Sequence, residues 1–173
     1  MSFHADTAAD AASTYAMTGP MPAFDPSRIR YRLETPADGE TIEAIAEEAF
    51  GPGRYVRAAE RVRELYPIVP SLCFVASDGD AIAGSVRMTG FANAPERALM
   101  LGPLAVRPHL KGRGIGKTLM RHAARKAGDE GYRAIYLVGD PPYYALLGYR
   151  AIEPGRITLP RPADPSRILV LDL

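Results

Sequence analysis

Hydrophobic and polar positions in the first half of the chain follow patterns that predict both strands and helices. Residues 29–33 alternate apolar side chains with arginines, as a strand with one buried face does. Apolar residues recur at helical spacing over 38–50, and residues 54–65 predict a second helix. Two apolar runs, 72–76 and 81–88, are separated by a polar turn that contains a glycine, which predicts a β-hairpin.

The second half of the chain contains the pattern of a buried parallel strand pair. Residues 99–106 are apolar almost throughout, which is typical of a central strand covered on both faces. Gly102-Pro103 interrupts this run, and because proline lacks the N–H that a ladder needs, we expect a bulge or splay there. A helix over 114–130 and a buried strand over 134–138 follow, an order that predicts a parallel pair with a crossover helix. A short helix and three strand segments are expected after them, at residues 141–148, 149–152, 157–159 and 168–171.

Composition limits the class of protein. With 173 residues, 47% hydrophobic and 24% charged, the chain has the size and composition of one soluble globular domain. We expect this domain over 29–173, after an N-terminal extension, 1–28, that has no periodicity and can drape over the domain or stay mobile. The single cysteine, Cys73, excludes an intramolecular disulfide and suits the cytoplasm. No stretch approaches the roughly 18 apolar residues of a membrane helix, so we expect a cytoplasmic protein without a membrane partner.

Charge is distributed unevenly along the chain. The formal net charge is +1, yet residues 107–126 carry seven basic residues and no acidic one, while the first fifty residues carry nine acids and three bases. A local positive charge in a nearly neutral chain predicts a specific anionic partner. Nucleic-acid-binding domains are usually basic overall, and the aromatic residues that single-strand binding favours are absent from 107–126, so we expect no nucleic acid partner.

A glycine-rich segment, Lys-Gly-Arg-Gly-Ile-Gly-Lys-Thr at 111–118, opens the helix predicted over 114–130. A P-loop needs glycine where Lys111 stands, and a dinucleotide fingerprint needs a small residue where Lys117 stands, so both spacings fail. What remains is a turn whose backbone N–H groups converge on a pyrophosphate at a helix N-terminus, where the helix dipole adds about half a positive charge. The alternative without a ligand is a plain glycine-rich loop before a helix with a solvated basic face.

Three motifs occur in this order along the chain: Leu101-Gly102-Pro103-Leu104-Ala105-Val106-x-Pro108, Lys111-x-x-Gly114-x-Gly116 and Gly139-Asp140-Pro141-x-Tyr143-Tyr144-x-x-x-Gly148-Tyr149. With them the sequence resembles the GNAT superfamily of N-acetyltransferases, in particular its YhbS-like subgroup. The resemblance in element order covers 29–173, with the specific motifs confined to 99–149. One departure is Lys111, where the family has Gln or Arg. It alters side-chain contacts but leaves the backbone amides unchanged.

The resemblance implies a fold and a cofactor. The fold is α/β, or α+β by some schemes: a mixed, mostly antiparallel central sheet of six to seven strands, with a parallel splayed central pair and flanking helices. The cofactor is acetyl-CoA, used as a co-substrate, with no metal. In this family the main chain of the splayed strand pairs with the pantetheine amides, which assigns that role to Leu104 and Val106. The cofactor-binding residues expected from the resemblance are Leu104, Ala105, Val106, Lys111, Gly112, Arg113, Gly114, Ile115, Gly116 and Lys117.

Acetyl transfer to an amine sets two further requirements. A lysine-like amine has a pKa of about 10.4, so its deprotonation at pH 7 costs roughly 4 to 5 kcal/mol and needs a base or a water chain. The departing thiolate needs an acid, and Tyr144 occupies the place of the family's tyrosine acid. Glu47 and Glu48 are candidate bases because the family's acceptor site is bordered there, and we name Glu48.

Other polar residues near these motifs have simpler explanations. His109 follows the central strand and is expected to flank phosphate, and His122 falls on a helix, half exposed. Tyr143 is expected to pack, and Asp140 to cap the short helix before Pro141.

The implied function is an acetyl-CoA-dependent N-acetyltransferase that transfers the acetyl group directly to a primary amine. The alternative is a non-catalytic acyl-CoA-binding sensor or interaction module of the same fold. The acceptor stays open between small-molecule and peptide amines, because no diagnostic motif marks its pocket. The oligomeric state also stays open, with a homodimer among the alternatives.

Overall fold

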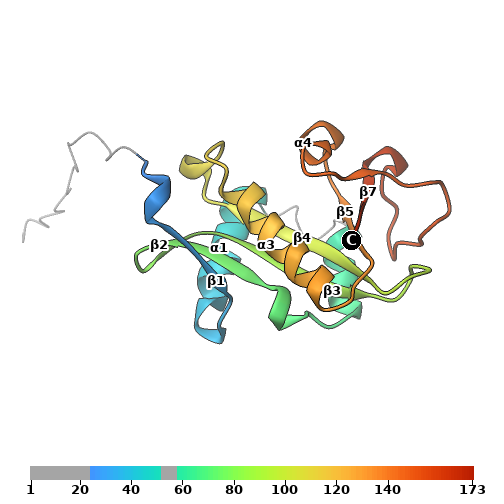
Figure 1. Cartoon of the computed structure of the whole chain (residues 1–173), viewed down its shortest axis with the longest axis horizontal. Coiled ribbons are helices and arrows are strands. Elements are labelled where there is room, and N and C mark those ends of the chain that lie inside the picture. The colour runs from blue at the N-terminus through green and yellow to red at the C-terminus, as the bar shows by residue number, and fades with distance from the viewer. Residues whose placement is uncertain (1–23, 52–57) are drawn as a thin grey trace, which may run out of the picture.

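The computed structural model describes residues 24–51 and 58–173, which form a mixed β-sheet with helices on both faces (Figure 1). The strands are β1 (Ile29–Leu33), β2 (Phe74–Asp78), β3 (Ala81–Phe91), β4 (Ala98–Val106), β5 (Ala134–Val138), β6 (Arg150–Ala151) and β7 (Ile168–Asp172). The α-helices are α1 (Gly39–Phe50), α2 (Ala58–Leu65), α3 (Ile115–Asp129) and α4 (Pro141–Ala145). Predicted segments 1–23 and 54–57 lie outside the described residues.

The sheet has seven strands in the order β1-β2-β3-β4-β5-β7-β6. Only β4 and β5 are parallel neighbours, and α3 is the crossover between them. The α/β fold class, the mixed and mostly antiparallel sheet and the parallel central pair are therefore confirmed. The strand expected at 157–159 is wrong: Ile157 is buried, but Pro154 and Pro160 bracket it and cannot donate to a ladder.

The parallel pairing of β4 with β5 is short, because it covers only Ala98, Leu99 and Met100. Beyond this point β4 stays paired with β3 alone, and the register of that pairing shifts opposite Gly102-Pro103. The predicted bulge and splay are thus present, and they open a gap between the central strands.

An extra residue at the bulge keeps the hydrophobic side chains of β4 on one face. Leu99 and Leu101 pack into the cluster under α3, and so do Leu104 and Val106 beyond the bulge. Without the extra residue the strict alternation of a strand would turn the second pair to the opposite face. The bulge therefore supplies the apolar wall beside the splay.

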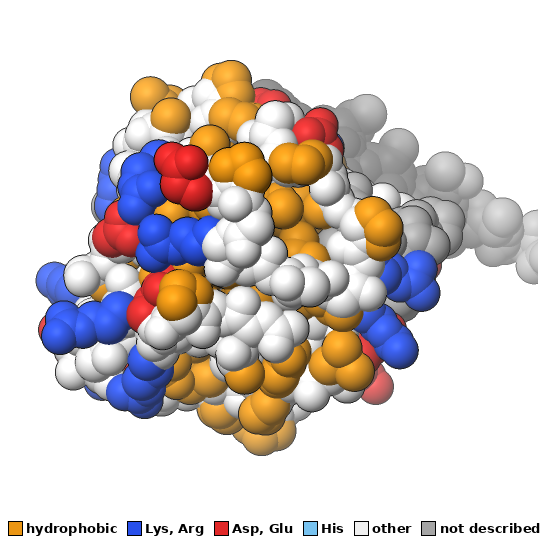
Figure 2. Space-filling view, turned by 90° about the vertical axis from the view of Figure 1, so that its right-hand side faces the viewer, with side chains coloured by type: hydrophobic (Ala, Val, Ile, Leu, Met, Phe, Trp, Pro, Cys, Tyr) orange, Lys and Arg blue, Asp and Glu red, His pale blue; other side chains and the backbone are white. Residues whose placement is uncertain are grey.

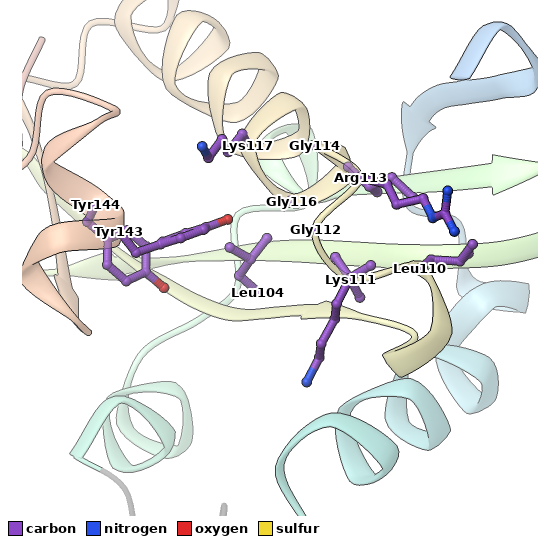
Figure 3. Close-up of a pocket in the computed structure, with 12 residues that line it drawn as sticks. Leu104, Leu110, Lys111, Gly112, Arg113, Gly114, Gly116, Lys117, Tyr143 and Tyr144 are labelled. Atoms are coloured by element: carbon purple, nitrogen blue, oxygen red, sulfur yellow. The ribbon is translucent and has the colours of Figure 1, made fainter. Parts of the chain in front are cut away.

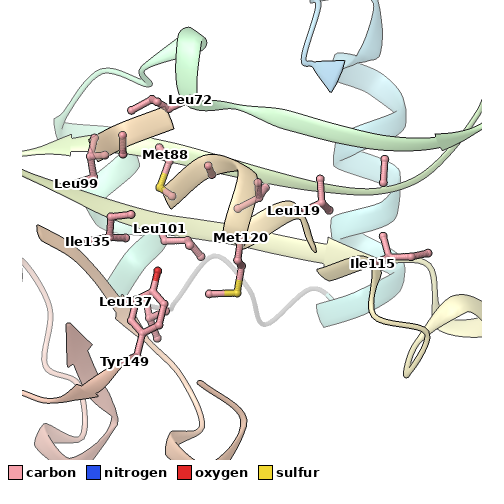
Figure 4. Close-up of a cluster of buried hydrophobic side chains, with 14 of the residues drawn as sticks. Leu72, Met88, Leu99, Leu101, Ile115, Leu119, Met120, Ile135, Leu137 and Tyr149 are labelled. Atoms are coloured by element: carbon pink, nitrogen blue, oxygen red, sulfur yellow. The ribbon is translucent and has the colours of Figure 1, made fainter. Parts of the chain in front are cut away.

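Helix α3 covers one face of the sheet, while α1 and α2 cover the other (Figure 1). The predicted apolar stripe of α3 is buried, at Ile115, Leu119, Ala123 and Ala127. It packs against β3, β4 and β5 in a cluster that includes Met88, Leu99, Leu101, Ile135 and Leu137 (Figure 4). In the part of the chain described, no helix has both the length and the apolar character needed to cross a membrane.

Candidate functional site

Helix α3 begins in a turn that requires glycine. After a 3-10 turn at Pro108–Leu110 the chain passes through Gly112 and Gly114, whose φ angles are 77° and 82°. Side chains with a β-carbon rarely adopt these conformations, whereas glycine does so freely. Gly114 is the N-cap of α3, and its carbonyl accepts the first helical hydrogen bond from the Thr118 N–H at 3.0 Å. The predicted glycine turn thus stands at the head of the crossover helix.

This turn leaves a run of backbone donors unused. The N–H groups of residues 112–117 find no acceptor anywhere in residues 24–51 and 58–173. Converging N–H groups at a helix N-terminus, together with the helix dipole, form a site for a phosphate or diphosphate. The turn therefore leaves free the main-chain donors that the predicted pyrophosphate site requires.

Three cations surround the unused donors. Lys111, Arg113 and Lys117 come from the turn and the first turn of α3, and their side chains spread in different directions (Figure 3). Within the described part of the chain, none of the three forms an ion pair with a carboxylate. On the face that Figure 2 shows, basic side chains lie beside acidic ones instead. Ion pairs that involve the C-terminal part of the chain include Arg150–Asp172 and Arg156–Glu96.

A pocket of about 450 Å³ joins the turn to the splay of β4. This volume lies in the usual range for a small-ligand site. Figure 3 shows α4 on one side of the pocket and the glycine turn on the other. The residues that line it are Leu104, Val106, Leu110, Lys111, Gly112, Arg113, Gly114, Ile115, Gly116, Lys117, Tyr143 and Tyr144.

The main chain of β4 directs polar groups to its splayed edge, beside the same pocket. The Arg107 N–H donates to the Ala83 carbonyl of β3 at 2.9 Å. Because the direction of the backbone N–H and C=O groups alternates along a strand, those of Ala105 also point toward β3. Leu104 and Val106 alternate with these residues and direct their N–H and C=O groups to the splayed edge. Ala105 differs from its neighbours, because its buried side chain packs with α1 on the other face and does not line the pocket.

Tyr144 stands at the splay, where its ring packs so closely against Gly139, the residue after β5, that a β-carbon there would collide with it. The ring also contacts Tyr143 and Tyr149 edge-on, with centroid distances of 4.9 and 5.9 Å. Burial raises the pKa of Tyr144 to about 12, with smaller contributions of the same sign from Tyr143 and Asp140. The hydroxyl therefore holds its proton throughout the neutral range.

Tyr143 is a pocket residue that the sequence analysis assigned to packing. It is 37% exposed and lines the pocket, and its Oη would lie 3.3 Å from a β-carbon at Gly116. The Lys117 ammonium lies 5.8 Å from its ring centroid. The sequence signal for this role was the pair of adjacent tyrosines in the short predicted helix. Leu110, also missed, is the apolar residue directly before the turn.

The candidate bases do not line the pocket. Glu48 lies on α1 with 43% of its side chain exposed, and its carboxylate accepts a hydrogen bond from the Arg107 guanidinium at 2.8 Å. Glu47 is exposed. His109 is exposed, and His122 is half-buried and stacks on Tyr31 with a centroid distance of 5.3 Å.

Asp140 precedes α4 as expected, but the expected side-chain cap is wrong. Its side chain makes no capping hydrogen bond, and its carbonyl instead accepts from the N–H groups of Tyr143 and Tyr144. The short helix is thus started by its own backbone and by Pro141 at its first position.

An ion network around a buried arginine on the α1 face was not anticipated. The Arg87 guanidinium binds both carboxylate oxygens of Glu34, at 2.8 and 2.6 Å, and one oxygen of Glu43 at 2.9 Å. Arg87 is 9% exposed and stands on β3 opposite the bulge of β4. An arginine within the otherwise apolar run 81–88 was the signal in the sequence.

Comparison with known proteins gives four consistent similarities. The model of the acetyltransferase (GNAT) family matches residues 40–149. The uncharacterized N-acetyltransferase YhbS of Escherichia coli (strain K12) is 26% identical over 120 residues, which are 68% of this chain and 71% of that protein. The crystal structure of YhbS in complex with CoA matches with a TM-score of 0.66 at 22% identity, covering 86% of this chain and 84% of that one. A GNAT family acetyltransferase from Brucella melitensis in complex with acetyl-CoA matches with a TM-score of 0.62 at 24% identity, covering 83% and 87%.

Proposed function

The chain belongs to the acetyltransferase (GNAT) family, and from this premise we propose that it is an acetyl-CoA-dependent N-acetyltransferase. In this proposal an acetyl group moves directly from the thioester to a primary amine of a small-molecule or peptide acceptor. The observation that carries the proposal is the run of unused N–H groups at 112–117, joined by one pocket to a half-buried tyrosine at the splay.

The pocket fits the proposed cofactor group by group. The N–H groups of 112–117 suit a diphosphate, Lys111 and Lys117 add positive charge around it, and Arg113 adds a third positive charge at the edge of the pocket. The splayed edge at Leu104 and Val106 offers main-chain groups to the amides of the pantetheine arm. When bound, acetyl-CoA supplies the acetyl group in the activated form of a thioester.

Tyr144 is proposed as the proton donor. Its Oη holds a proton at neutral pH, because burial raises its pKa to about 12. It stands where the strands part, so a sulfur atom at the end of the pantetheine arm would come within its reach. A tyrosine in this position can donate its proton to the departing thiolate and so prevent the reverse reaction.

Proton removal from the acceptor amine is the open step in this proposal. Glu48 remains our proposed base, and to accept a proton it must exchange its hydrogen bond with Arg107 for one with the acceptor or a water molecule. Among the described residues, those that line the pocket include no Asp, Glu or His. That feature favours the second candidate function, an acyl-CoA-binding module without catalysis.

One variant separates the two candidate functions. We expect Tyr144→Phe to lower kcat by roughly 100-fold or more, since a positioned acid contributes about that much, while the Kd of acetyl-CoA changes less than about twofold. Release of free thiol is measured with a panel of amine acceptors, and binding of acetyl-CoA by calorimetry. Tyr143→Phe is the matched control, because it removes the neighbouring hydroxyl from the same helix.

The outcomes are distinct. An enzyme loses turnover in Tyr144→Phe and keeps its cofactor affinity. A binding module takes up acetyl-CoA but releases no thiol with any acceptor, in the wild type or the variant. A wild-type chain that gives no heat with acetyl-CoA contradicts both functions.

A further inference from the structure

A phenylalanine ahead of the first strand lies against the glycine turn. The guanidinium carbon of Arg113 is 4.9 Å from the centroid of the Phe24 ring, within the range of a cation–π contact. Phe24 is itself half-buried and packs against the hydrophobic cluster under α3. The ring is therefore held by the domain core, and it holds the arginine in turn.

Arg113 is directed away from the remainder of the pocket. Figure 3 shows its side chain pointing away from Tyr143 and Tyr144, whereas Lys117 lies on their side of the turn. Arg113 has no carboxylate partner among the residues that the structure describes. Its positive charge is thus available to a ligand group that lies outside the run of backbone N–H groups.

Contact with an aromatic ring orients a guanidinium before it binds phosphate. An arginine side chain carries about 2 kcal/mol of rotamer entropy, part of which is lost whenever it binds. An aromatic ring against the guanidinium restricts these rotamers in advance, while N–H groups that point away from the ring stay free for paired hydrogen bonds. Phosphate oxygens are well suited to accept such bonds.

We infer that Phe24 positions Arg113 to bind the 3′-phosphate of coenzyme A. This inference rests on the proposed function, in which the diphosphate of the same cofactor occupies the N–H groups of 112–117. Coenzyme A has one more anionic group, the phosphomonoester on its ribose, and this group lies beyond the diphosphate as seen from the thioester. Arg113 is the cation of the turn that faces outward and is oriented by an aromatic ring. The segment before β1 thereby contributes to cofactor selection.

A comparison of two ligands isolates this contact. Calorimetry gives the Kd of coenzyme A and of 3′-dephospho-coenzyme A for each protein, and the ratio of the two Kd values measures how much the 3′-phosphate contributes. We expect the wild type to prefer coenzyme A by about 10-fold or more, as a charge-assisted phosphate contact predicts. Arg113→Ala should bring the ratio close to one. Lys111 comes from the same turn and has no aromatic partner among the described residues, so Lys111→Ala should leave the ratio near its wild-type value.

Two substitutions of Phe24 test the positioning role. Phe24→Leu keeps an apolar side chain in the core but removes the ring, so the ratio should fall about two- to fivefold, the size of an exposed cation–π contact. Phe24→Tyr keeps the ring and should retain the wild-type ratio. A merely structural role would change both Kd values together and leave the ratio constant.

Several results would overturn the inference. One is an unchanged ratio in Arg113→Ala or Phe24→Leu. Another is an equal loss of both ligands in Arg113→Ala, which would place Arg113 on the adenine or the diphosphate instead. If the wild type binds coenzyme A but with no preference over the dephospho form, this inference fails and the proposed function stands. If the wild type binds neither ligand, both fail.

Discussion

The two faces of the sheet treat their charges differently. On the α3 face, the N–H groups of 112–117 have no acceptor among the described residues, and the cations around them have no carboxylate partner there. On the α1 face, Arg87 is bound by Glu34 and Glu43. Arg107 is likewise bound by Glu48. One face keeps its donors free for a ligand, and the other neutralises its charges internally.

This difference explains why the proposed cofactor site is better defined than the proposed acceptor site. A site made of unused backbone donors specifies an anion of a certain shape, whichever side chains surround it. A face whose charges pair with one another carries little information about the charge of its ligand. The three predictions that follow test this contrast, beginning with the largest effect.

The backbone of the turn should matter most. We expect Gly114→Val to weaken acetyl-CoA binding by at least about 100-fold, because a β-branched residue rarely adopts the φ of 82° and the rearranged turn loses two or more charge-assisted hydrogen bonds. Calorimetry with acetyl-CoA measures the loss. Circular dichroism and thermal unfolding show whether the domain stays folded.

Gly128 provides the matched control within the same helix. It lies near the end of α3, without positive φ, and a β-carbon there meets no atom within 4 Å. Gly128→Ala should leave the Kd of acetyl-CoA unchanged and raise the free energy of unfolding by up to about 1 kcal/mol. Equal Kd values for Gly114→Val and Gly128→Ala would contradict a backbone-built site.

The ion network of the α1 face should matter for stability and not for the cofactor. Arg87→Met leaves Glu34, whose side chain is only 17% exposed, without its partner, and should lower the free energy of unfolding by roughly 3 kcal/mol. Urea denaturation measures this effect, and the Kd of acetyl-CoA should stay within about twofold.

The surface pair between Arg28 and Asp78 is the comparison for that variant. Its side chains are 61% and 41% exposed, so Arg28→Met should cost less than about 1 kcal/mol. A parallel loss of cofactor affinity in Arg87→Met would show instead that the two faces are energetically coupled, which the contrast between them does not anticipate.

The parts of the fold that the sequence predicts well are those governed by local rules. The stripe of α3 has a regular period, and the turn at 112–114 is marked by glycines. Gly102-Pro103 predicts the bulge because no regular ladder accepts proline in its interior. Each of these features depends on residues close together in the chain.

The parts that were missed depend on contacts between distant residues. Arg87 and Glu34 are 53 residues apart, so a pairing between them has no local signature. The contact between Phe24 and Arg113 likewise has no local signature, because Phe24 precedes the predicted domain and Arg113 lies within it. Ile157 shows the converse error, since its apolar neighbourhood predicts a strand but flanking prolines leave it as a packed loop.

The smallest expected effect is a change in stability at acidic pH, and it involves only the α1 face. Asp38, at the start of α1, accepts two hydrogen bonds from Arg32 at 2.7 and 2.8 Å, and others from the N–H and hydroxyl of Thr35. The Arg32 guanidinium, followed by the Thr35 N–H and hydroxyl, holds the pKa of Asp38 well below its usual range, although burial acts in the opposite direction.

Because the folded pKa of Asp38 lies below the unfolded value of about 3.9, the carboxylate stabilises the fold above pH 4, and this contribution is lost as the pH falls further. Asp38→Asn should therefore be less stable than the wild type at pH 7, and the difference should shrink between about pH 4 and pH 2. Urea denaturation at each pH measures it, and Arg32→Met completes a double-mutant cycle whose coupling should fade over the same interval. A difference that stays constant with pH would mean that Asp38 acts only through neutral hydrogen bonds, and the α1 face would then owe less to its paired charges than its geometry indicates.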